Sequence, residues 1–184
     1  MLDPGHGGSD TGAVNESCNL KESEEALKVA ILLKGLLEAD GHTVCMTRTT
    51  NSETLSNNDR YTYANTTGAE ILVSIHMNGS SNPATDDTTT TFGKWRKDKE
   101  LAYAVFDGLT TPPVASGTGT IATRDPYSFA SGVLLKSNMP ATIAEPVFIT
   151  SDAEGRILSD GTGARQQQIA EVLEKGIEDY LSTH

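Results

Sequence analysis

Apolar residues recur along the chain with two spacings, and these predict alternating helices and strands. Between Glu22 and Glu38 they stand three and four positions apart, which predicts a helix with one buried face that stops before Gly41; they are Ala26, Leu27, Ala30, Leu33 and Leu37. Similar spacing predicts helices over residues 56–67, 98–109 and 164–181. Shorter apolar and β-branched runs predict strands over residues 43–48, 70–75, 133–135 and 142–149.

Two polar stretches interrupt this alternation. Residues 78–93 are rich in Ser, Asn, Asp and Thr, with a threonine run at 88–91, and we expect a loop or a loose hairpin there. Residues 110–119 predict a second loop. The alternation favours an α/β fold, an open, mostly parallel (mixed) sheet of about six strands with helices on both faces. Because 184 residues are near the usual size of one compact domain, we expect a single catalytic domain over 1–184.

Charge and cysteine content narrow the classes of partner. The formal net charge is −11, so the chain has no basic face for nucleic acid or an anionic membrane, and substrates with neutral or cationic groups fit better; a merely soluble surface is the plainer interpretation. We expect no membrane insertion, no export signal at the start of the chain, and a monomer. Cys18 and Cys45 lack metal-type spacing, so we expect thiols, with a single bridge left open.

Two histidines and two glutamates follow or begin the predicted elements, in an order that suits a zinc hydrolase. His6 follows a very short N-terminal strand, and His76 follows the strand 70–75. Glu145 lies in or at the end of the strand 142–149, and Glu22 lies in the first turn of the first helix. Ligands of open α/β sheets bind at the carboxyl edge of the strands. We therefore expect these four side chains to converge at that edge.

Each of these residues also has a structural interpretation. His6 lies among glycines and a proline that any tight turn favours. With Asn19 as N-cap, Glu22 occupies the position of a capping-box carboxylate. His76 can be a hydrogen-bonded polar residue at the sheet edge. Glu145 needs a partner in its apolar surroundings, either Lys136 or Arg124 or a metal-bound water.

The ordered motifs LDPGHGG, an ES pair at a helix start, TR followed by NDRYTYAN, VSIHMN and PATIAE give the chain a specific resemblance. The chain resembles the zinc-dependent N-acetylmuramoyl-L-alanine amidases of the amidase-3 family, found in bacterial autolysins and phage endolysins. The resemblance extends from Leu2 to the last predicted helix. It implies a zinc enzyme that acts on peptidoglycan in the cell wall, at an extracellular or periplasmic place, by cutting the amide bond between N-acetylmuramic acid and L-alanine.

The same resemblance implies the roles of individual residues. His6, Glu22 and His76 are the implied zinc ligands, a set that leaves an open position for water, and Glu145 is the implied catalytic base. Asn78 lies two residues beyond His76 and so faces the same side of the chain, where we expect it to bind substrate or to orient a ligand by a hydrogen bond. Arg60 and Asn65 match family positions on the second predicted helix, where we expect structural roles. His42 and His184 belong to no motif, and we expect both to be solvated.

The chain departs from the family pattern at two places. Only Met1 and Leu2 precede Asp3, so the strand before the first motif is short. Pro146 and Val147 follow Glu145, and because proline lacks an N–H group we expect strand pairing to end there. Two other functions remain open from the sequence. One is a different zinc peptidase or deacylase on the same fold, and the other is a catalytically inactive module that binds the cell wall.

Overall fold

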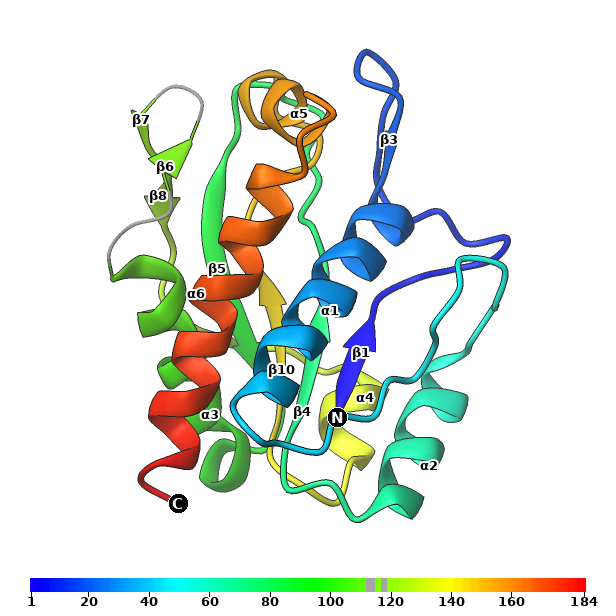
Figure 1. Cartoon of the computed structure of the whole chain (residues 1–184), viewed down its shortest axis with the longest axis vertical. Coiled ribbons are helices and arrows are strands. Elements are labelled where there is room, and N and C mark those ends of the chain that lie inside the picture. The colour runs from blue at the N-terminus through cyan, green and yellow to red at the C-terminus, as the bar shows by residue number, and fades with distance from the viewer. Residues whose placement is uncertain (112–114, 117–118) are drawn as a thin grey trace.

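The computed structural model describes residues 1–111, 115–116 and 119–184 and contains one central sheet covered by helices (Figure 1). The helices are α1 (Glu22–Ala39), α2 (Asn57–Thr67), α3 (Trp95–Thr110), α4 (Gly132–Lys136), α5 (Asp152–Leu158) and α6 (Ala164–Leu181). The sheet contains β1 (Leu2–Pro4), β4 (Leu72–Ile75), β10 (Ala141–Glu145), β5 (Asp87–Phe92), β8 (Ala122–Thr123) and β9 (Tyr127–Ser128). Two further pairs are β2 (Val14–Asn15) with β3 (Leu20–Lys21) and β6 (Ala115–Ser116) with β7 (Gly119–Thr120).

The sheet is mixed and mostly parallel, as the sequence predicts. Its order is β1-β4-β10-β5-β8, with β9 also paired to β5. Strands β1, β4 and β10 run parallel to one another, β5 runs antiparallel to β10, and β8 and β9 run parallel to β5. The carboxyl ends of β1, β4 and β10 therefore meet at one edge. The start of β5 joins them there because this strand is reversed.

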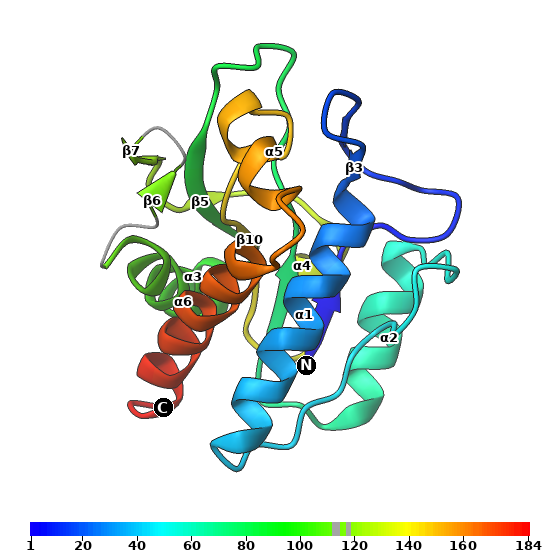
Figure 2. The same ribbon diagram turned by 45° about the horizontal axis from the view of Figure 1, so that its top comes forward.

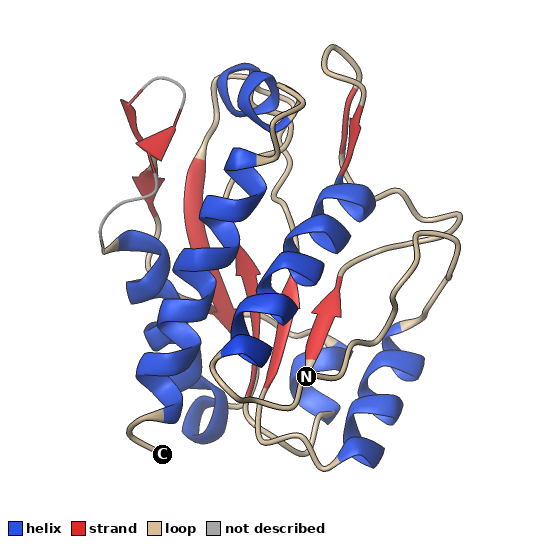
Figure 3. Ribbon diagram, viewed as in Figure 1, coloured by secondary structure: helices blue, strands red, loops and turns tan. Residues whose placement is uncertain are grey.

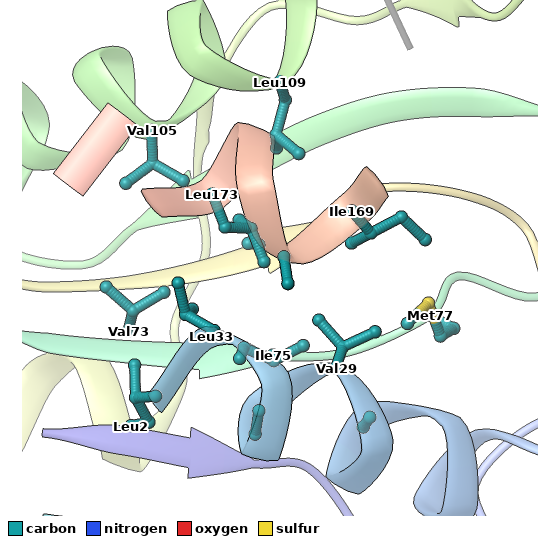
Figure 4. Packing of buried hydrophobic residues seen from close by; sticks show 14 of the residues in the cluster. Leu2, Val29, Leu33, Val73, Ile75, Met77, Val105, Leu109, Ile169 and Leu173 are labelled. Carbon is teal, nitrogen blue, oxygen red and sulfur yellow. The ribbon is translucent and has the colours of Figure 1, made fainter. Parts of the chain in front are cut away.

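Helices cover both faces of the sheet, with strands in the middle layer (Figure 3). On one face, α1, α3 and α6 share a core with the strands, in which Val29, Leu33, Val105, Ile169 and Leu173 pack together (Figure 4). On the other face, α2 and α4 bury a smaller cluster that contains Ala64, Leu134 and Ile143. Within the described residues, no helix is both long enough and apolar enough to cross a membrane.

Local sequence explains where the first two helices end. Helix α1 stops at Ala39, and Gly41 has the positive φ of 96° that glycine adopts readily. Ser56 caps α2 in a reciprocal capping box with Asp59, and Gly68 ends that helix in the left-handed conformation. Both helices lie where the sequence predicts them.

The threonine run corrects the second half of the expectation of a loop or a loose hairpin over residues 78–93, because residues 87–92 form β5 whereas residues 78–86 are a loop. Thr88 to Thr91 lie in β5 and are buried, with at most 2% of any side chain exposed. Two of the hydroxyl groups donate to distant backbone carbonyls: Thr88 donates to the carbonyl of Pro146 at 2.5 Å, and Thr90 donates to the carbonyl of Ala102 at 2.8 Å. Oγ1 of Thr91 has no hydrogen-bond partner among the described residues. Because threonine is β-branched, a run of it suits a strand once most of its hydroxyl groups have partners.

Two other predicted strands are also wrong in part or in full. Residues 133–135 belong to the helix α4, since a short apolar run carries no clear period. Residues 43–48 make only a single bridge, between Met46 and Leu2, before the chain leaves the sheet. Strand β10 ends at Glu145, because Pro146 cannot donate to the next pairing. The predicted loop 110–119 lies partly outside the described residues, and β6 and the first residue of β7 lie within it.

Candidate metal centre and active site

The loop after β1 carries His6 in a left-handed backbone conformation, with φ of 57°. Two buried arginines hold this loop. Arg60 donates to the carbonyl oxygens of Pro4 and His6, each at 2.7 Å, and Arg48 donates to the carbonyl of Gly5 at 2.7 Å. Such contacts compensate for the uncommon backbone conformation of a residue other than glycine. The second helix therefore has the structural role in this loop that the sequence predicts for Arg60.

Gly5 allows the ring of His76 to lie against the backbone of this loop. A Cβ atom on Gly5 would stand 2.4 Å from Cε1 and 2.5 Å from Nε2 of His76, which is closer than atoms can approach. His76 directly follows β4, and its backbone N–H donates to the carbonyl of Ala144 in β10 at 3.0 Å. Glycine at position 5 is therefore needed for the loops that carry His6 and His76 to lie against each other.

Glu22 is the first residue of α1, and its carboxylate turns into the protein. Only 5% of this residue is exposed. Oε2 accepts a hydrogen bond from the backbone N–H of Ala13 at 2.8 Å, and Oε1 accepts one from the N–H of Met77 at 3.1 Å. The capping-box interpretation is wrong, because the N-cap is Lys21 and α1 has no side-chain cap. Glu22 instead joins the loops that carry the histidines.

Glu22, His6 and His76 form a compact cluster of metal-ligand atoms. Oε1 of Glu22 lies 3.1 Å from Nε2 of His6 and 2.9 Å from Nδ1 of His76. One ligand atom from each residue lies within 4.8 Å of the other two. Zinc binds histidine nitrogen and carboxylate oxygen at about 2.0–2.2 Å, so its ligand atoms stand roughly 3.5 Å apart. The donor types and their spacing fit a divalent ion of this kind.

Electrostatics keep Glu22 in the ionised form that binds a cation. Burial opposes ionisation of Glu22, but hydrogen bonds and positive charge from His6 and His76 hold the pKa of this carboxyl well below its usual range. Burial of the His6 ring disfavours its protonation, yet hydrogen bonds to Glu22 and Asp10 raise the pKa of His6. A metal cation that displaced the proton from His6 would be attracted by the same negative charges of Glu22 and Asp10.

Glu145 stands beside His76 at the same edge of the sheet. Ala144 pairs with Ile75, so Glu145 and His76 are the next residues in the register. Nδ2 of Asn78 donates to Oε2 of Glu145 at 2.7 Å. Burial raises the pKa of Glu145, although positive charge on His76 and Arg124 opposes this effect. Within the described residues the carboxylate has an amide partner rather than an ion pair with Arg124 or Lys136, because Arg124 pairs with Asp87 and Lys136 lies over the ring of Tyr61.

Two residues of the site were missed from the sequence. Asp10 places Oδ2 at 2.9 Å from Nδ1 of His6, and so orients the ring. The signal was a carboxylate four positions after a histidine in a glycine-rich loop. Arg48 is 1% exposed and joins the His6 loop to the start of α1, because its Nη2 donates to the carbonyl of Ser23 at 2.7 Å. Its position in the TR motif gave no hint of this contact.

The remaining residues that the sequence singled out lie away from the cluster. Asn65 accepts from the N–H of Asn138 at 2.7 Å and donates to the carbonyl of Lys136 at 3.0 Å, which is a structural role. His42 pairs with Glu178, and His184 pairs with Glu100, so each has a surface partner besides solvent. Cys18 and Cys45 are both free thiols.

The hairpin β2–β3 and α5 rise at the carboxyl edge of the sheet (Figure 2). Asn15 of this hairpin donates to the carbonyl of Ile149 at 2.9 Å. A Cβ atom on Gly155 in α5 would lie 2.4 Å from Nδ2 of Asn15, so the hairpin and α5 are in close contact.

Comparison with known proteins gives consistent matches over the whole chain. The family model described as N-acetylmuramoyl-L-alanine amidase matches residues 1–179. N-acetylmuramoyl-L-alanine amidase AmiA of Salmonella typhimurium is 28% identical over 98% of this chain and 75% of its own length. The sporulation-specific N-acetylmuramoyl-L-alanine amidase of Bacillus subtilis is 29% identical over 99% of this chain and 68% of its own length. The catalytic domain of CwlV, an N-acetylmuramoyl-L-alanine amidase from Bacillus (Paenibacillus) polymyxa, superposes with a TM-score of 0.86 at 27% identity, over 100% of this chain and 97% of that domain.

Proposed function

Since the chain belongs to the N-acetylmuramoyl-L-alanine amidase family, we propose that it hydrolyses the amide bond between N-acetylmuramic acid and L-alanine of the peptidoglycan stem peptide. The observation that carries this proposal is the convergence of His6, Glu22 and His76 on one point, with Glu145 beside them. A buried carboxylate next to a metal-ligand cluster is the arrangement that a metal-assisted amide hydrolysis requires.

We propose zinc as the cofactor, with His6, Glu22 and His76 as its ligands. Their two nitrogens and one oxygen suit zinc better than magnesium or calcium, which prefer oxygen ligands. When bound, zinc would polarise the substrate carbonyl and make water a stronger nucleophile. Asp10 holds the ring of His6 through Nδ1, which leaves Nε2 directed at Glu22.

Glu145 is the proposed general base and acid. Asn78 occupies Oε2, so Oε1 is the oxygen that is left to take a proton from the attacking water. The same carboxyl then returns this proton to the departing nitrogen of L-alanine. Burial favours the first of these transfers, because it raises the pKa of Glu145 and so makes the protonated form easier to reach. Asn78 is proposed to hold the carboxylate in place.

The proposed substrate also indicates where the protein acts. Peptidoglycan lies outside the inner membrane, so we propose that the protein works in the cell wall, as an autolysin or an endolysin. We propose that residues 1–184 act as one catalytic domain, which the match over residues 1–179 supports. A monomer remains our prediction.

The test is mass spectrometry of fragments released from purified peptidoglycan by the wild type and by Glu145→Gln. We expect stem peptides with a free L-alanine amino terminus from the wild type, their loss on treatment with a chelator, and their return when zinc is added. Glu145→Gln should release at most about a hundredth of that amount. The matched control is Glu171→Gln, which changes an exposed glutamate of α6 and should cleave like the wild type.

Two outcomes would contradict the proposal. Cuts between amino acids of the stem, dependent on zinc and on Glu145, would show a peptidase on the same fold. Binding of the wild type to peptidoglycan without release of any fragment would show a module that binds the cell wall.

A further inference from the structure

Arg124 lies in the same row of the sheet as the proposed catalytic glutamate. Glu145 in β10 pairs with Thr89 in β5. On the other side of β5, Thr123 pairs with Thr88, and the N–H of Arg124 donates to the carbonyl of Thr88 at 2.9 Å. The register therefore continues with Arg124 opposite Thr89. Residues paired across neighbouring strands project from the same face of a sheet, so Arg124 and Glu145 share a face.

The guanidinium of Arg124 is held in place but remains accessible. It lies 4.9 Å from the centre of the Tyr127 ring, and Nη2 stands 3.4 Å from Oδ1 of Asp87. The arginine side chain is 45% exposed. A single long contact with a carboxylate at the surface binds weakly. It leaves other N–H groups of the guanidinium available to a ligand, while the ring of Tyr127 limits its motion.

The distances match a carboxylate of the proposed substrate. Two strand spacings separate Glu145 from Arg124, which is about 10 Å between their backbones. The second residue of the stem peptide, D-glutamate, carries an α-carboxyl group about 7 Å along the chain from the bond to be cut, at 3.3–3.6 Å per residue. An arginine side chain spans the remaining distance. Because the protein carries a net charge of −11, an arginine at this position gives the edge a local attraction for an anion.

We propose that Arg124, stacked on Tyr127, binds the α-carboxylate of the second stem residue and makes the enzyme prefer stems in which this group is free over stems in which it is an amide. This inference rests on the proposed amidase function and adds a specificity determinant to it. Glutamine at position 124 would keep a polar side chain but lose the charged fork that carboxylates bind.

The test compares two synthetic substrates, N-acetylmuramoyl-L-alanyl-γ-D-glutamyl-L-lysine and the same compound with the α-carboxyl amidated. We expect the wild type to favour the free acid about tenfold in kcat/KM. Arg124→Gln should bring the ratio close to one, and Arg124→Lys should give an intermediate ratio. Arg96→Gln is the control, because Arg96 is an exposed arginine of α3 beyond the opposite end of β5 and its loss should leave the ratio unchanged.

A binding measurement separates failure of this inference from failure of the amidase proposal. Titration calorimetry with the two compounds in the Glu145→Gln background reports recognition without cleavage. A preference for the acid that disappears with Arg124→Gln supports the inference even where the wild type cleaves neither compound, and in that case only the amidase proposal falls. Equal kcat/KM and equal affinity for both compounds, or a preference that survives Arg124→Gln, would overturn the role of Arg124. Circular dichroism of each variant confirms that it is folded.

Discussion

Nδ2 of Asn78 donates a hydrogen bond of 2.7 Å to Oε2 of Glu145, and so joins the segment after β4 to the end of β10. The other side-chain atom of the amide is also used, because Oδ1 of Asn78 accepts from the N–H of Gly79 at 2.8 Å. The amide therefore has one orientation, with its N–H groups toward the glutamate. In the proposed mechanism, this contact leaves Oε1 of Glu145 free to exchange a proton.

Replacing Asn78 should lower turnover more than substrate binding. Asn78→Ala removes a hydrogen bond to a carboxylate, and we expect kcat to fall about tenfold or more with KM little changed. Asn78→Asp should be worse, since it sets a negative charge against Glu145. Asn58→Ala, an exposed change on α2, is the control. Initial rates of L-alanyl peptide release give both constants, and an Asn78→Asp variant as active as the wild type would rule out this role.

Removal of the Glu22 charge should abolish metal binding while the fold is kept. Glu22→Gln has nearly the same shape and can still accept from the N–H of Ala13, but it loses the negative charge between the two histidines. We expect zinc affinity to drop more than about a hundredfold. Competition with a chromophoric chelator and elemental analysis after dialysis measure this change. Glu24→Gln, two residues further along α1, should retain one zinc per chain; equal zinc content in both variants would remove Glu22 from the ligand set.

Two glycine-to-alanine substitutions should have opposite effects, one through a steric clash and the other through helix propensity. Gly5→Ala places a methyl group 2.4 Å from the His76 ring, so we expect displacement of this ring and at least about a hundredfold loss of activity and metal affinity. Gly35→Ala in the middle of α1 meets nothing within 4 Å and should raise the free energy of unfolding by about 0.5–1 kcal/mol. Urea unfolding and zinc titration of both variants test the pair. Full zinc affinity in Gly5→Ala would show that the His76 ring has room to move.

The stability contributed by Asp86 should decrease as the pH rises. Burial raises the pKa of this half-buried carboxyl; its Oδ1 accepts from the N–H of Phe148 at 3.1 Å, and Oδ2 has no hydrogen-bond partner among the described residues. The folded state therefore holds its proton to a higher pH than the unfolded state, and the wild type loses stability as pH rises through this interval. Asp86→Asn does not titrate, so its stability relative to the wild type should increase between about pH 4 and pH 7.

Asp160→Asn is the matched control for that pH dependence, with the opposite sign. Hydrogen bonds from the side chain and the backbone of Thr162 lower the pKa of Asp160. The wild type therefore gains stability from Asp160 as pH rises, and the asparagine variant should fall behind it. Urea unfolding between about pH 4 and pH 7 measures the Asp86 trend, and urea unfolding below about pH 4, where the unfolded chain protonates Asp160 before the folded chain does, measures the Asp160 trend. The same trend in both variants would mean that the burial of Asp86 does not control its titration.

Periodic patterns in the sequence predicted the long helices and the core strands well. The helix that begins at Glu22 and the strand before His76 have apolar spacing that only one element satisfies, and both lie where expected. The buried threonines of β5 could not be predicted in this way. Their burial depends on carbonyl groups of Pro146 and Ala102 that are distant in the sequence, so the run resembles a solvated loop until the sheet is assembled.

The convergence of His6, Glu22 and His76 was predictable from the sequence, whereas the contacts that support these residues were not. His6, Glu22 and His76 stand at the ends of elements, and the carboxyl ends of parallel strands meet at one edge of a sheet. The partner of Glu145 was missed, because Lys136 and Arg124 were the nearest candidates by charge, whereas the amide of Asn78 is nearest in space. A hydrogen bond between two loops leaves no periodic trace in the sequence.

The arginines beneath the site give it a property that its ligands alone would not have. Arg48 donates hydrogen bonds both to the loop that carries His6 and to the first turn of α1, and Arg60 of α2 donates to the same loop. The loop of His6 and the first turn of α1 are therefore positioned by arginine side chains, which are permanent parts of the protein. We expect little conformational freedom to be lost when an ion binds between these segments. We therefore expect the site to discriminate among divalent ions by size.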